Sequence, residues 1–126
     1  MSLGVTLDAG PLIHLDHANH RVIVLLARAQ QTGERVIVPA TALAQAIRDP
    51  SRQARLARLL RQPRTDVVAL DRVDATAVGR LLAASGSSDI ADANVVVCAR
   101  RSDTTVVTSD PTGLRALDPT PTLTVV

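Results

Sequence analysis

Aromatic residues are absent from this 126-residue chain, which has no Phe, Trp or Tyr. Modules that bind nucleic acid by stacking bases on aromatic side chains, such as RRM and OB-type domains, are therefore excluded. Aromatic cages for quaternary ammonium ligands are excluded for the same reason. Hydrophobic residues still make up 46% of the chain, nearly all of them Val, Leu, Ile and Ala. Any packed core must therefore be aliphatic.

Cysteine, long apolar runs and lysine are also scarce or missing. The single cysteine, Cys98, rules out an internal disulfide framework and a Cys-rich zinc site. No apolar run approaches the ~18 residues of a membrane span, and no signal-peptide pattern opens the chain. We therefore expect a cytoplasmic protein with no membrane partner. All 14 basic residues are arginine, whose planar guanidinium suits phosphate, and the formal net charge of +2 permits a nucleic-acid partner without requiring one.

Short β-branched runs alternate with longer helical stretches along the chain. We predict strands at residues 3–7, 35–38, 67–70, 104–107 and 123–126. Helices are predicted after Asp8, at 19–31, 41–48, from Ser51, at 74–84 and 89–101, and after Asp110, with Thr41 capping the helix at 41–48. Strands separated by helices predict right-handed crossovers. The expected fold is one three-layer α/β domain over residues 1–126, with a mostly parallel sheet of four or five strands.

Four aspartates fall where such a sheet binds ligands, in the crevice beyond the carboxyl ends of the strands. Asp8 follows the first predicted strand and Asp110 follows the fourth. Asp89 and Asp92 open the helix before the fourth strand, and their i, i+3 spacing places them on one helical face. If the first and fourth strands are neighbours, these carboxylates converge, and their repulsion favours a shared Mg²⁺ or Mn²⁺. Such a metal activates water for displacement at phosphorus.

Each of these aspartates also has an ordinary structural interpretation. Asp89 and Asp92 are typical of a helix N-cap and first turn, where the helix dipole favours acids. Asp8 can cap the first helix, and Asp110, which precedes a proline, can start a turn. The joint placement of the four residues is what favours a site.

Four segments then occur in a characteristic order: LDAGPLI at 7–13, VPATALAQ at 38–45, DIADANVVVCA at 89–99 and VTSD at 107–110. Together they resemble a PIN domain, and in particular the VapC toxins of bacterial toxin–antitoxin pairs. The resemblance covers essentially the whole chain. It implies a Mg²⁺- or Mn²⁺-dependent endoribonuclease that forms a homodimer and is neutralised by a cognate antitoxin.

The same resemblance implies roles for individual residues. Asp8, Asp92 and Asp110 match the family's catalytic, metal-holding acids. Asp89 falls where some members carry an additional acid near the metal. Thr108 matches the hydroxyl residue that commonly precedes the last acid, where it would orient a ligand or a water molecule.

One position departs from the family pattern. The family's second acid is a glutamate six residues beyond the proline, but this chain has Gln45 there, and its one glutamate, Glu34, precedes the second strand. An amide can coordinate Mg²⁺ or hold a metal-bound water, but it brings no charge and cannot act as a base. Either Asp89 restores the charge, or the protein is a weak nuclease that binds RNA or its antitoxin. We favour the first because the other three acids remain.

Arginines recur every three residues at Arg52, Arg55, Arg58, Arg61 and Arg64. This spacing suits either a solvated face opposite a leucine stripe or a track along one side of a helix for RNA phosphate or an acidic antitoxin. Arg100 and Arg101 are explained by the dipole of the helix that they end. A metal-dependent phosphatase on a similar sheet is a third hypothesis, disfavoured because no D-x-D motif follows the first strand.

Overall fold

The computed structural model describes residues 4–126, which form one all-parallel sheet of five strands with seven α-helices packed around it. The strands are β1 (Gly4–Leu7), β2 (Arg35–Pro39), β3 (Thr65–Val68), β4 (Thr105–Thr108) and β5 (Leu123–Val125). The helices are α1 (Ala9–Asp16), α2 (His20–Thr32), α3 (Ala40–Ala46), α4 (Ala54–Leu60), α5 (Arg72–Ser85), α6 (Ile90–Ser102) and α7 (Pro111–Leu117), with a 3₁₀ turn, η1 (Pro50–Arg52), before α4. The predicted α/β class and parallel sheet are confirmed. Leu3, the start of the first predicted strand, lies outside the described residues.

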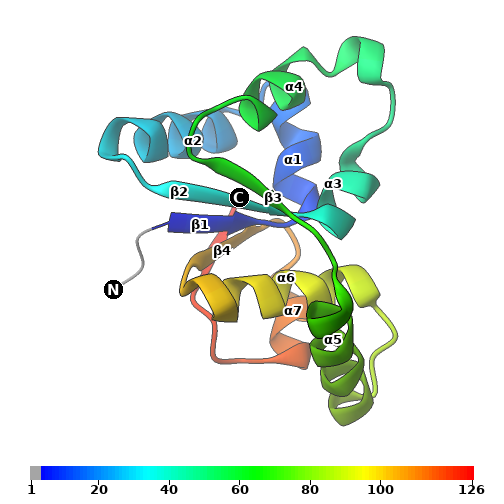
Figure 1. The fold of residues 1–126 in the computed structure, drawn as a ribbon. Helices are drawn as coiled ribbons and strands as arrows, with labels where there is room; N and C mark the ends of the chain where they lie inside the picture. The colour runs from blue at the N-terminus through cyan, green and yellow to red at the C-terminus, as the bar shows by residue number, and fades with distance from the viewer. Residues whose placement is uncertain (1–3) are drawn as a thin grey trace.

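The strands lie in the order β3-β2-β1-β4-β5. Figure 1 shows α1 to α4 on one face of the sheet and α5 to α7 on the other. The chain first advances from β1 to β3 toward one edge, and then returns across the opposite face through α5 and α6, so that β4 pairs with β1. The strand order therefore reverses between β1 and β4, and the crevice beyond the carboxyl ends at such a reversal is where open α/β sheets bind ligands.

Caps explain where several helices begin and end. The side chain of Asn19 accepts a hydrogen bond from Val22 N at 3.2 Å and starts α2, while Gly33 ends that helix in the left-handed region at φ 72°. Asp71 starts α5 in the same way, by accepting from Asp74 N at 2.8 Å. Because these signals are local, the predicted bounds of both helices agree with the structure to within two residues at each end.

Helix α6 forms the centre of the aliphatic core. Residues 93–99 are all buried, and Val95 and Val96 are at most 1% exposed. A helix that is apolar on every side has to be covered on every side. Here the sheet covers α6 on one side while α3, α5 and α7 contact it on the others. Each valine buried in this way contributes about 1.5 kcal/mol or more to the free energy of unfolding.

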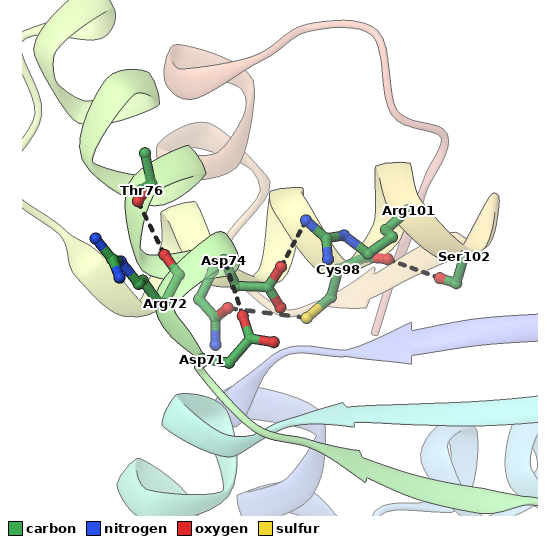
Figure 2. A network of polar contacts seen from close by, with 8 residues as sticks. Asp71, Arg72, Asp74, Thr76, Cys98, Arg101 and Ser102 are labelled. Carbon is green, nitrogen blue, oxygen red and sulfur yellow. Dashed lines mark hydrogen bonds and ion pairs between the residues drawn. The ribbon is translucent and has the colours of Figure 1, made fainter.

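Two arginines at the C-terminal end of α6 form ion pairs with α5 and with the residue that follows α7. Arg101 Nη2 lies 2.7 Å from Asp74 Oδ1 on α5, an ion pair that lacks hydrogen-bond geometry, and the Asp74 side chain is only 3% exposed (Figure 2). Arg100 Nε donates to Asp118 Oδ2 at 2.7 Å, just beyond α7. The helix dipole alone was therefore an incomplete explanation of this arginine pair. Burial, with a further contribution from Asp74, raises the pKa of the neighbouring Cys98 thiol to about 11, so this cysteine is a packed and unreactive side chain.

Two predicted features of the α3 region were wrong. Thr41 does not cap α3 but lies inside it, because the helix already begins at Ala40 and the Thr41 hydroxyl accepts a hydrogen bond from Asn94. The segment from Ser51 forms η1, and α4 begins only at Ala54. Gln53 lies between η1 and α4, and its side-chain oxygen accepts hydrogen bonds from the backbone N–H groups of residues 48 and 49. These bonds hold the chain in a turn, so the helix is interrupted there.

Strand β3 lies two residues earlier than predicted. Residues 65–68 pair with residues 36–39 of β2, and this register sets the limits of the strand. The predicted span of 67–70 was based on the β-branched run alone, and such a run does not indicate which residues pair with the neighbouring strand. In residues 4–126 no helix is long and apolar enough to cross a membrane.

Candidate active site

Asp8 stands between β1 and α1, at the point where the sheet reverses its strand order. Its carboxylate is fixed by both oxygens, since Oδ1 accepts from Ala9 N at 2.8 Å and Oδ2 accepts from the Thr108 hydroxyl at 2.8 Å. Its backbone N–H donates to Val107 O at 3.0 Å and extends the β1–β4 pairing by one residue. Asp8 therefore caps α1, and Thr108 holds the oxygen that the cap does not use.

Thr108 also orders the turn that carries Asp110. The fully buried Thr108 hydroxyl accepts a hydrogen bond from Asp110 N at 3.0 Å, so one side chain links the ends of β1 and β4. Asp110 occupies the N-cap position of α7 but makes no side-chain capping bond. Its exposed carboxylate is therefore not committed to the helix.

Asp89 and Asp92 approach the same end of the sheet from α6. Asp89 Oδ1 accepts from Asp92 N at 3.0 Å, so the helix-cap interpretation of Asp89 is correct. A cap engages one oxygen of this carboxylate, and Asp89 is exposed. Asp92 is half-buried in the first turn of α6, where its own side chain caps nothing.

The four aspartates influence one another electrostatically. Burial raises the pKa of Asp92 to about 7, and the charges of Asp8, Asp89 and Asp110 contribute further. Burial also raises the pKa of Asp8, although the hydrogen bonds from Thr108 and Ala9 oppose that rise. A site in which neighbouring carboxylates disfavour the ionisation of Asp8 and Asp92 is electrostatically incomplete without a cation.

Gly113 on α7 makes room for this cluster. A Cβ atom at Gly113 would lie 2.9 Å from Asp92 Oδ2 and 3.8 Å from Asp110 Oδ2, so both carboxylates border the space that the missing side chain leaves. Sequence reasoning missed this residue. The available signal was a glycine inside a predicted helix, where it costs about 1 kcal/mol relative to alanine and so suggests a packing or functional reason.

Gln45 lies on the exposed side of α3. It lines a shallow hollow together with Thr41 of α3 and with Ser88, Asp89 and Ala91 at the start of α6. The structure therefore brings Gln45 and Asp89 to one hollow, although they are 44 positions apart in the chain.

The arginine series lies elsewhere. The prediction of a single helical track was wrong, because Arg52 belongs to η1, Arg61 ends α4 and Arg64 lies in the turn before β3. Arg52 is exposed and pairs with Asp49 at 3.5 Å. Arg55 and Arg58 line a groove between α2 and α4 whose apolar wall includes Leu15, near the end of α1 that is opposite Asp8.

Residues 5–118 of the sequence match the PIN domain. The chain belongs to the PIN domain family. The matched span contains all four aspartates, Gln45 and Thr108. PIN domains are generally metal-dependent nucleases, and those nucleases generally use divalent metal ions. Among curated proteins, none matches the sequence at a significant level.

The donors of this PIN domain fit a hard divalent cation. Aspartate oxygens are the ligands that Mg²⁺ and Mn²⁺ prefer, and the space beside Gly113 borders two of the carboxylates. Within residues 4–126, however, no three His, Cys, Asp or Glu side chains are gathered in a metal-binding arrangement. A bound cation would offset the repulsion that Asp89 and Asp110 exert on Asp8 and Asp92.

The raised pKa of Asp92 predicts how the stability of the metal-free protein depends on pH. Because the folded-state pKa of about 7 exceeds the ordinary value of 3.8, the folded state binds this proton more tightly than the unfolded state. The contribution of this proton to the free energy of unfolding is fully present below about pH 3.8 and is lost as the pH rises through 7. We expect Asp92→Asn, which cannot ionise, to have a higher Tm than the wild type at pH 8 in EDTA, with the difference shrinking toward pH 4.

Calorimetry across this range measures that difference, and the same series with Mg²⁺ is the control. Added Mg²⁺ should raise the Tm of the wild type more than that of Asp92→Asn. A difference in Tm that stays constant with pH would contradict the electrostatic coupling of Asp92.

Gly113→Ala tests the space beside the acids. We expect the variant to fold, because alanine favours a helix by about 1 kcal/mol over glycine, but to lose most of the Mg²⁺-induced rise in Tm, since the new methyl group crowds Asp92. Gly79→Ala on α5 is the matched control, because no atom lies within 4 Å of its added Cβ. Equal Mg²⁺-induced shifts in the two variants would show that Gly113 has no part in the site.

Proposed function

We propose that this PIN domain is a Mg²⁺- or Mn²⁺-dependent endoribonuclease, the toxin of a VapBC-like toxin–antitoxin pair. The observation that supports this function best is the group of four interacting aspartates at the reversal point between β1 and β4, in which Asp92 has a pKa of about 7. A strongly perturbed carboxylate in a ligand-binding crevice is typical of a catalytic site. The resemblance of the four sequence segments to VapC toxins adds the substrate class.

Asp8, Asp92 and Asp110 would hold the metal ion and act as the catalytic acids. When bound, the ion would supply an activated water and stabilise negative charge at the phosphodiester. The hydrogen bond from Thr108 keeps the second oxygen of Asp8 in a fixed direction, as outer-shell partners of metal ligands generally do. The same hydroxyl sets the direction of the Asp110 turn.

Asp89 would replace the charge that Gln45 lacks. Both residues line the same hollow beside the acid cluster, and Asp89 contributes to the raised pKa values of Asp8 and Asp92. Gln45 would then serve through its amide, as a neutral ligand of a bound water. A protein in which this replacement fails would be a weak nuclease that binds RNA or its antitoxin.

Cleavage of total RNA with Mg²⁺, Mn²⁺ or EDTA tests the activity. We expect metal-dependent cleavage that falls by about 100-fold or more in Asp8→Ala and Asp92→Asn, because each change removes a ligand of the metal ion that would stabilise the reacting phosphate. Asp89→Asn should also lose most activity, since no other acid would then supply the negative charge that Gln45 lacks. Asp66→Asn, an exposed carboxylate on β3, is the control and should cleave like the wild type.

Two results would contradict this proposal. Unchanged cleavage by Asp92→Asn would exclude the site. RNA binding by the wild type without cleavage under either metal would favour the weak binding module.

We propose that the cognate antitoxin binds in the groove between α2 and α4. Its wall is apolar, with Leu26 and Leu59 buried beneath it, and Arg55 and Arg58 stand exposed at its side. A leucine-lined groove flanked by cations suits an acidic amphipathic helix. It suits RNA less well, because this chain has no aromatic side chains on which RNA bases could stack. The homodimer and a cytoplasmic location remain predictions from the sequence.

Reversing two charges tests the groove. We expect Arg55→Glu with Arg58→Glu to weaken, by about tenfold or more, the binding of a synthetic amphipathic helix with leucine on one face and glutamate on the other. Fluorescence anisotropy with a labelled peptide measures this. Arg72→Glu with Arg80→Glu, exposed on α5, is the matched control. Loss of RNA cleavage with unchanged peptide affinity would assign these arginines to the substrate instead.

A further inference from the structure

Helix α3, which carries Gln45, has few local interactions that fix its position. It has seven residues, and at its start Pro39 provides no side-chain cap. A helix of this length is not stable by itself in water, so its contacts with the rest of the protein determine where it lies. The buried residues that face the protein from α3 are Ala42 and Ala46, whose small side chains offer a smooth surface. Leu43 is partly buried and also packs against the core, but apolar packing of this kind is not directional.

A buried amide on α6 supplies a directional contact. Asn94 is 0% exposed, and its Nδ2 donates to the Thr41 hydroxyl on α3 at 2.7 Å. The other end of the amide faces Cys98, whose thiol lies 3.8 Å from Asn94 Oδ1. An amide buried this deeply is costly to leave without its partner, so the bond to Thr41 resists any shift of α3 along α6.

This bond joins the two elements that form the hollow beside the acids. Asn94 follows Asp92 by two residues on α6, and Thr41 precedes Gln45 by four residues on α3, which places Thr41 and Gln45 on one side of that helix. Thr41, Gln45 and Asp89 line the same hollow. A change in the Asn94–Thr41 bond is therefore a change in how Gln45 lies relative to Asp89.

The other end of α3 is held differently. Gln53 Nε2 donates to Ala46 O at 2.8 Å, and Gln53 Oε1 accepts from the backbone of the turn that follows. This second amide fixes α3 to its own loop and, because Nε2 also donates to Asp16 Oδ2 at 3.2 Å, to the end of α1, but not to α6. Asn94 is therefore the side chain through which α6, the helix with two of the acids, sets the position of α3.

We propose that Asn94 is a positioning residue of the active site. By holding Thr41, it keeps α3 in register with α6 and keeps Gln45 beside Asp89 at the hollow that both residues line. In this chain the second acid of the family is replaced by a neutral amide, which no charge attraction draws toward a metal ion. Its placement then depends on the fold. The consequence for metal binding rests on the proposed function, whereas the fixing of α3 does not.

Thr41→Val tests this inference, because it removes the hydroxyl and keeps the shape of the side chain. We expect faster hydrogen exchange of the α3 backbone amides, measured by NMR, and Mn²⁺ affinity lowered on the order of tenfold, measured by titration calorimetry. Thr104→Val is the matched control, since it removes a buried hydroxyl that lies just before β4, at the end of that strand away from Asp110, and contacts Thr6 and Ser102. It should leave both α3 exchange and Mn²⁺ affinity unchanged. Thr41→Ser, which retains the hydroxyl, should behave like the wild type.

A double variant separates positioning from stability. Thr41→Val with Asn94→Leu leaves no buried amide unpartnered, so its Tm should recover toward the wild-type value while its Mn²⁺ affinity stays low. Recovery of the affinity together with the Tm would overturn the proposal, as would α3 exchange or Mn²⁺ affinity in Thr41→Val equal to that in Thr104→Val. If the wild type binds no Mn²⁺, the proposed metal chemistry fails, and the exchange comparison alone decides whether Asn94 fixes α3.

Discussion

The electrostatic cost of carboxylates near the ends of β1 and β4, which comes first from burial and then from their mutual repulsion, is the constraint on which this protein depends. Strand order makes neighbours of β1 and β4, the strands that precede Asp8 and Asp110, and α6 adds Asp89 and Asp92 from the facing layer. Burial and mutual charge raise the pKa of Asp92 to about 7, so the metal-free site is a source of instability in the folded protein. A fold that retains such a cluster needs another source of stability around it, and a reason to keep it.

The stability comes from an aliphatic core centred on α6. Without aromatic side chains, the core is built of Val, Leu, Ile and Ala, and α6 is buried along almost its whole length between the sheet and three helices. At the end of α6 away from the acids, Arg100 and Arg101 pair with Asp118 and Asp74. One end of the helix therefore concentrates negative charge while the other has its charges neutralised, which confines the unfavourable electrostatics to the candidate site.

Buried polar side chains place what apolar packing cannot. Thr108 links Asp8 to the Asp110 turn with one hydroxyl, and Asn94 holds α3 through Thr41. Hydrogen bonds of this kind add little net stability, but they are directional and costly to break in a dry interior. In a chain where Gln45 replaces a charged ligand, such contacts determine how the neutral amide is presented.

The sequence by itself determined the element types, the parallel α/β fold and the candidate acids, because β-branched runs, helical periodicity and residues after strand ends are local signals. It also indicated that Asp89 can cap α6. Only the tertiary structure decided that β4 pairs with β1, that Thr41 serves Asn94 and not its own helix, that Gly113 borders Asp92, and that the arginines lie on different elements. These features depend on contacts between residues far apart in the chain, and a contact of that kind leaves no periodicity in the sequence that would reveal it.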